Sequence, residues 1–169
     1  IPDERAARWN ESEIKVMWSM QDSSHRENAQ RWKDSGIIEG WYGDGNFART
    51  TIMYSLWKSK GTYIQPWRKD VMLGAEIKGD SLYISIRSEA PWEGKLHFDK
   101  KRHAVNMNLP VDWPRINQFP EWFVVLDEHV YRIAEEKKKV GDATGVLLHS
   151  GIDIALKANE TKRFVVTAD

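Results

Sequence analysis

The sequence predicts a mostly β protein, an antiparallel β-sandwich preceded by a small amino-terminal segment of about three short helices. Two observations carry this prediction. Apolar side chains recur at helical spacing before residue 62, and from residue 67 onward they alternate with a period of two. About nine short alternating runs, separated by polar turns, are typical of a sandwich. We therefore expect a helical segment over residues 1–62 and a β-sandwich over residues 63–169.

Helical periodicity and capping residues predict the helices at residues 10–20, 24–36 and 46–61. The first two open with the residue spacing of a capping box. The third follows a glycine-rich turn, and we expect Asn46 to cap its start and Gly61 to end it. This third helix joins the helical segment to the strands.

Alternation predicts the strands, most clearly at residues 71–78 and 82–87, where the intervening Gly-Asp-Ser is a hairpin signal. The charge run at residues 135–139 is interpreted as a solvated turn. Three prolines make residues 110–120 an irregular loop. The other expected strands are residues 95–98, 104–109, 122–126, 130–133, 146–148, 152–156 and 163–167.

Composition excludes several function classes. Lysine plus arginine equals aspartate plus glutamate at 25 each, whereas a general nucleic-acid binder carries a basic excess. The absence of cysteine excludes disulfides, thiolate zinc sites and cysteine nucleophiles. No apolar run approaches the roughly 20 residues of a membrane span. The five histidines form no metal-binding motif, and no nucleotide-binding loop is present. We therefore expect no metal, no cofactor, no nucleic acid and no membrane partner.

Nine tryptophans are an unusual number for 169 residues. Tryptophan is a large core residue, but its ring also stacks on flat surfaces, including sugar rings. So many tryptophans in one chain indicate that at least one of them forms an exposed aromatic platform.

A first candidate site lies at the turn before the third helix. A pair of carboxylates performs acid–base chemistry on glycosidic bonds, and Glu39 and Asp44 form such a pair in the sequence. Trp41, Tyr42 and Asn46 beside them are able to hold a sugar. The alternative is that Asp44 and Asn46 only shape the turn and cap the helix.

A second candidate site is the proline-rich loop. Trp113 and Trp122 supply flat apolar faces, and Arg115 and Asn117 supply groups that bind hydroxyls or carboxylates. The alternative is a crossover loop that closes one end of the sandwich with its aromatic side chains buried.

The stretch from about residue 40 to residue 125 resembles the carboxy-terminal region of bacterial glycan-processing enzymes, of glycoside hydrolase or polysaccharide lyase type. Those enzymes consist of an α/α toroid followed by a β-sandwich. The similar pieces are WYGDGNFARTTIMYSLWKSKG, PWRKDVMLGAE, APWEGKLHFDKKRH and LPVDWPRINQFPEWF.

The resemblance implies an accessory, carbohydrate-binding part of such an enzyme, in a secreted or periplasmic location. Its partners would be an oligosaccharide or polysaccharide and the helical part of the parent protein. The main catalytic groups would lie in toroid helices outside this chain, which begins with Ile1 and is therefore expected to be a processed or trimmed piece.

Two other functions remain open from the residues. One is a structural or protein-docking domain without a ligand of its own. The other is a small free-standing glycoside hydrolase or lyase that uses Glu39 and Asp44.

Overall fold

The computed structural model describes residues 4–19, 45–101, 108, 122–136 and 138–168. The chain divides into two compact units, Ile1–Ser55 and Leu56–Asp169, and the division falls inside helix α3 (Gly45–Ser59). The first unit also contains helix α1 (Glu4–Ser19), and the second contains the strands and helix α5 (Gly145–Ser150). None of the described helices combines the length and the apolar character needed to cross a bilayer.

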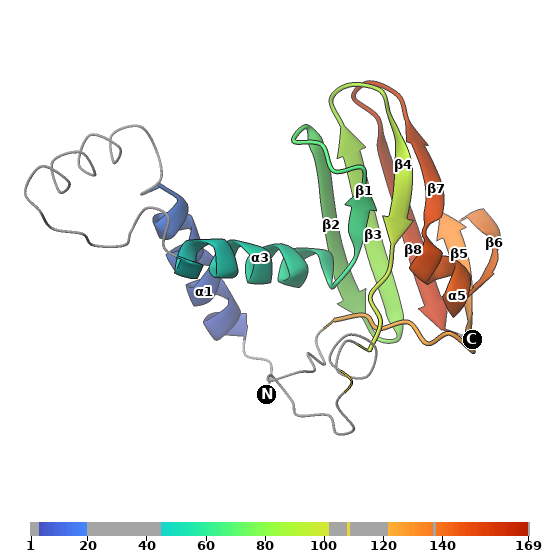
Figure 1. Ribbon diagram of the computed structural model, residues 1–169, viewed down its shortest axis with the longest axis horizontal. Helices are drawn as coiled ribbons and strands as arrows, with labels where there is room; N and C mark the ends of the chain where they lie inside the picture. Colours follow the sequence, from blue (N-terminus) through green and yellow to red (C-terminus); the bar gives the residue numbers. More distant parts are fainter. Residues whose placement is uncertain (1–3, 20–44, 102–107, 109–121, 137, 169) are drawn as a thin grey trace, which may run out of the picture. The chain divides into compact units, whose positions relative to one another are not determined.

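The second unit consists of two antiparallel sheets in a sandwich-like arrangement, which confirms the predicted fold class (Figure 1). The three-stranded sheet has the order β1–β4–β7, and the five-stranded sheet has the order β2–β3–β8–β5–β6. The strands are β1 (Tyr63–Gln65), β2 (Val71–Lys78), β3 (Ser81–Ser88), β4 (Trp92–His97), β5 (Val130–Glu135), β6 (Lys138–Thr144), β7 (Ile152–Leu156) and β8 (Thr161–Ala168).

Strand β3 shows how alternation places the core. Leu82, Ile84 and Ile86 are at most 2% exposed, whereas Tyr83 and Arg87, at the alternate positions, point to the outer face of the sheet. Burial of each large aliphatic side chain contributes about 1.5–3 kcal/mol to folding. Both sheets and α5 supply the same core cluster, which also includes Leu96, Leu148, Ile154, Phe164 and Val166.

Residues 146–148 do not form the strand that we expected. They lie in α5, which begins after Thr144, whose hydroxyl accepts a hydrogen bond from the backbone N–H of Leu147 at 3.3 Å. Gly151 ends this helix. A three-residue apolar run has no readable period, so the cap decides the conformation rather than the run.

The expected hairpin of residues 122–126 with residues 130–133 is also wrong. Val124 forms only an isolated parallel bridge with Asp99, and β5 pairs instead with β6. The charge run of residues 135–139 contains the turn between β5 and β6 at Glu136, as expected, but Glu135 ends β5 and Lys138 and Lys139 begin β6. Its lysines are exposed at the edge of the five-stranded sheet, where charged side chains hinder pairing with another chain.

Helix α3 starts at Gly45, so Asn46 lies in its first turn and not in the expected N-cap position. Its end is close to the prediction, because Lys60 and Gly61 have φ values of 53° and 85°. The N–H of Gly61 donates to the carbonyl oxygen of Leu56 at 3.0 Å, the bond of a Schellman motif. The expected helix at residues 24–36 and the expected strand at residues 104–109 lie outside the described residues or almost entirely so.

Candidate functional site

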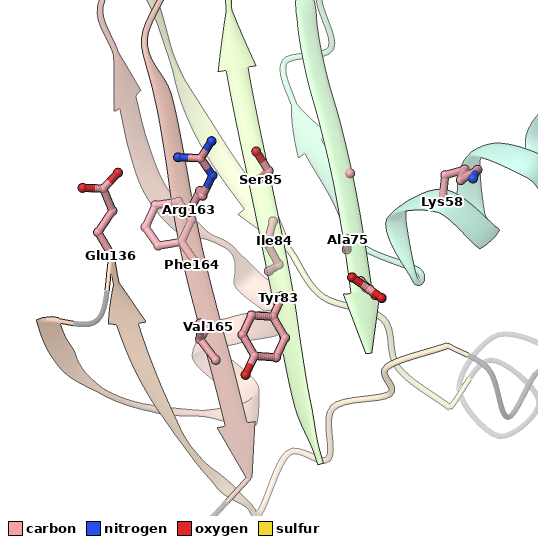
Figure 2. A pocket seen from close by; sticks show the side chains of 11 residues that line it. Lys58, Ala75, Tyr83, Ile84, Ser85, Glu136, Arg163, Phe164 and Val165 are labelled. Carbon is pink, nitrogen blue, oxygen red and sulfur yellow. The ribbon is translucent and has the colours of Figure 1, made fainter. Parts of the chain in front are cut away.

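A groove crosses the outer face of the five-stranded sheet, which points away from the core cluster. Its volume is about 730 Å³, and it runs over β2, β3 and β8 (Figure 2). Lys58 of α3 lies at one end, and Glu136, which follows β5, lies at the other (Figure 2). The lining side chains that point outward from the sheet are Glu76, Tyr83, Ser85, Arg163 and Val165.

Gly74 forms part of the groove floor in the middle of β2. A Cβ atom on Gly74 would meet nothing within 4 Å, and its φ is not positive, so neither crowding nor backbone conformation requires glycine here. Its partner across the ladder is Ser85, another small residue. Glycine weakens a strand and often marks a place where another molecule approaches closely. The missing side chain therefore deepens the groove over β2.

Tyr83 supplies an aromatic surface beside this hollow and is 44% exposed. It pairs with Glu76 on β2 and with Val165 on β8, so the three side chains form one row across the sheet. The ammonium group of Lys78 lies 5.8 Å from the centroid of the tyrosine ring. A tyrosine ring offers an apolar face and a hydroxyl, so this row is apolar at its centre and polar at its end.

Charged groups of both signs border the groove. Lys58 and Arg163 are cationic, and Glu76 and Glu136 are anionic. Within the described part of the chain, Arg163 and Glu136 form no ion pair, and both are exposed. The groove thus combines a flat apolar floor with separated hydrogen-bond donors and acceptors, the composition of a site for a polar ligand with flat apolar faces.

Most of the sequence-predicted site residues fall outside the described part of the chain. These residues are Glu39, Trp41, Tyr42, Asp44, Trp113, Arg115 and Asn117. Asn46 lies in the first turn of α3. Their proposed roles in catalysis and sugar binding stay predictions.

Trp122 is the one member of the second predicted site whose side chain the structure describes. It is 7% exposed and lines a cavity of about 530 Å³, together with Asp80, His129 and Tyr131. A ring this deeply buried offers little surface for stacking on a sugar. Its burial agrees with the alternative interpretation of the loop, in which the aromatic side chains pack inside.

His149 of α5 joins three segments at the same end of the sandwich. Its Nδ1 lies 2.7 Å from a carboxylate oxygen of Asp127, and its Nε2 lies 3.1 Å and 3.3 Å from the carbonyl oxygens of Val125 and Asp99. Both ring nitrogens thus face oxygen atoms, so the ring holds these three segments together. In the described residues, no three histidine, cysteine, aspartate or glutamate side chains are grouped to hold a metal ion.

The sequence patterns did not indicate the groove. The feature that could have indicated it is a glycine inside a regular strand, next to a strand whose outer side chains include Tyr83 and Ser85. Alternation shows that these side chains share a face, but it does not show whether another element covers that face.

Comparisons with models of protein families, with curated proteins and with solved structures find no match to this chain.

Proposed function

We propose that this chain binds oligosaccharides or polysaccharides through the groove on the outer face of its five-stranded sheet. In this proposal it serves as an accessory part of a bacterial carbohydrate-active enzyme. The observation that carries the proposal is the hollow above Gly74, open to solvent and flanked by the exposed ring of Tyr83.

Sugar chemistry fits this surface. A pyranose ring has a flat face of C–H groups, which stacks on an aromatic ring, and a rim of hydroxyls, which donate and accept hydrogen bonds. Tyr83 and Val165 supply the apolar contact, and the groups around them supply the polar ones. Charged partners strengthen bonds to hydroxyls, so Arg163 and Glu76 are the expected hydroxyl-binding residues. The length of the groove across three strands suits several linked sugars.

The test is calorimetric titration of the full chain with cellohexaose, xylohexaose and a hexagalacturonate. We expect saturable binding of at least one of these probes. Gly74→Val fills the hollow, and it should abolish binding in the groove without loss of stability, because valine favours strands and meets open space. Tyr83→Ala should weaken binding about tenfold, which corresponds to about 1.4 kcal/mol.

Gly141→Val is the matched control. Gly141 lies in β6 outside the groove lining, its φ is not positive, and a Cβ there also meets nothing within 4 Å. It should bind like the unmodified chain. Failure of the folded chain to bind any of the three probes, or equal binding by Gly74→Val, would contradict the proposal.

A second function, protein docking, is favoured by the exposed apolar side chains of the first unit. Trp9 on α1 is 65% exposed and Ile52 on α3 is 59% exposed. Sedimentation over a range of concentrations tests this function with a second copy of the chain as partner. Self-association that Ile52→Glu abolishes would support docking, and a monomer at every concentration counts against it.

A further inference from the structure

Trp67 lies in the connection between β1 and β2 and is 75% exposed, the largest exposed fraction among the large apolar side chains that the structure describes. It is not part of the groove lining. In Figure 1 this connection lies at the same end of the sheets as the β3–β4 and β7–β8 connections, opposite the turn between β2 and β3. An indole ring so far from the core contributes little to folding, because most of its apolar surface stays in water.

The next residue, Arg68, fastens this loop to the β3–β4 connection. Its Nε and Nη2 donate to the two carboxylate oxygens of Asp70 at 2.5 Å and 2.9 Å. Its Nη1 donates to the carbonyl oxygen of Pro91 at 2.8 Å, and Nη2 also donates to that of Ala90 at 3.0 Å. A planar guanidinium suits such bidentate contacts, and five donors in a fixed fork leave the loop few alternative conformations.

The residue before Trp67 is held as well. The indole N–H of the buried Trp92 donates to the carbonyl oxygen of Pro66 at 3.1 Å. Trp67 is therefore fixed through both of its neighbours while its own ring stays in solvent. A ligand that contacts this ring would not have to order the loop, which removes one of the usual costs of binding.

The charges at this end favour a neutral ligand. The exposed charged residues of the three connections are Lys69, Glu89 and Lys157, so no patch of one sign surrounds the tryptophan. A peripheral membrane-binding loop would combine its tryptophan with a cluster of basic residues that attract anionic lipids. An exposed indole ring among mixed charges suits the C–H face of a neutral sugar.

The geometry points to Trp67 as a second carbohydrate contact, at the end of the sandwich and separate from the groove, for pyranose rings of a neutral polysaccharide. This inference rests on the proposed function of the chain and adds a second point of attachment to it. Two contacts on one chain raise the apparent affinity for a long polymer well above that for a short oligosaccharide, provided that one polymer surface reaches both. In this arrangement Arg68 is a positioning residue, which acts through Trp67.

The experiment compares the unmodified chain with Trp67→Ala, with Trp67→Phe and with Trp9→Ala, an exposed tryptophan on α1. Depletion assays with insoluble cellulose and insoluble xylan measure the apparent affinity, and calorimetry with cellohexaose and xylohexaose measures the number of sites. We expect Trp67→Ala to weaken binding to the polymer at least tenfold and to remove one of two oligosaccharide sites. Trp67→Phe should retain part of the affinity, and Trp9→Ala should change nothing.

Arg68→Lys tests the positioning role. Lysine keeps the charge but lacks the planar guanidinium that binds Asp70, Ala90 and Pro91 at once. We therefore expect weaker polymer binding and a higher acrylamide quenching rate for Trp67 fluorescence. The Trp67 signal is obtained by subtracting the fluorescence of the same protein with Trp67→Phe. An unchanged quenching rate together with unchanged binding would overturn the role of Arg68.

The outcomes separate this inference from the proposed function. If Gly74→Val abolishes all binding and Trp67→Ala binds normally, the groove is the site and the role of Trp67 is wrong. If the folded chain binds none of the sugars, both proposals fall. A Trp67-dependent fluorescence shift with phosphatidylcholine–phosphatidylserine vesicles, with no shift for the sugars, would replace the sugar by a membrane surface and also overturn the inference.

Discussion

The two ends of the sandwich hold their tryptophans in opposite ways. Trp67 at one end is 75% exposed, and Trp122 at the other end is 7% exposed. Yet a polar side chain fastens the loops at both ends by binding backbone carbonyls, Arg68 at the first and His149 at the second. Exposure of Trp67 is therefore not the result of a loose loop. An ordered loop thus either buries a large ring, as for Trp122, or presents it to solvent, as for Trp67.

The largest expected effect concerns the buried ring of Trp122. Trp122→Ala should reduce the free energy of unfolding by about 3–5 kcal/mol, because it removes a large buried side chain and leaves a cavity. Trp67→Ala should stay within about 0.5 kcal/mol of the unmodified chain, as exposed substitutions usually do. Urea denaturation of both variants measures the two values, and similar losses in the two would show that the ends do not differ.

Removal of the His149 ring should have the next largest effect. His149→Leu places an apolar side chain there and leaves the carbonyl of the buried Val125 without its ring partner, so we expect a loss of about 1–3 kcal/mol in the free energy of unfolding. Asp127→Asn is the control, because Asp127 is 65% exposed and its contact with His149 should contribute at most about 1 kcal/mol. A larger loss for the control than for His149→Leu would mean that the contact with Asp127, and not the carbonyl contacts, holds this end.

The corresponding change at the other end should have a smaller effect. Arg68→Ala removes the bonds to Asp70, Ala90 and Pro91, but the side chain is 38% exposed, so water replaces part of what is lost. We expect the free energy of unfolding to fall by about 1 kcal/mol. Thermal unfolding measures this change, and near-ultraviolet circular dichroism reports the environment of Trp67. No change in either signal would show that the loop keeps its conformation without the hydrogen bonds of Arg68.

The smallest expected effect is a pH dependence at Asp70. The hydrogen bonds from Arg68 hold the pKa of this carboxyl below its ordinary value of 3.8. A carboxyl whose pKa is lowered by folding stabilises the protein above its unfolded pKa, and this contribution is lost as the pH falls through the lowered folded pKa.

Asp70→Asn lacks this titration. The stability difference between the unmodified chain and Asp70→Asn should therefore be constant near neutral pH and shrink below about pH 4. Denaturation at a series of pH values measures it. A difference that grows as the pH falls would contradict the sign of this linkage.

Local patterns account for the strands that were correctly predicted. The limits of β2 and β7 match the expected residues 71–78 and 152–156, since each strand carries its own alternation. The turn between β2 and β3 was equally readable, because Gly79 there adopts a positive φ of 59°.

Non-local contacts explain the errors. The pairing of β5 with β6 was not predicted, because the lysines of β6 have the composition of a turn and become a strand only beside β5. Residues 146–148 form a helix because Thr144 caps it and Leu148 reaches the core. Neither fact is visible in the apolar run itself.

The amino-acid order alone specifies which side chains share a face, where the chain turns, and hence that the protein is a sandwich with helices before it. It also shows that tryptophan is abundant and that the charges balance. The folded arrangement of the sheets specifies which of these faces and rings remain in contact with water. Tyr83 and Trp67 are exposed and Trp122 is buried because exposure depends on every segment that packs nearby, and most of those segments are distant in the sequence.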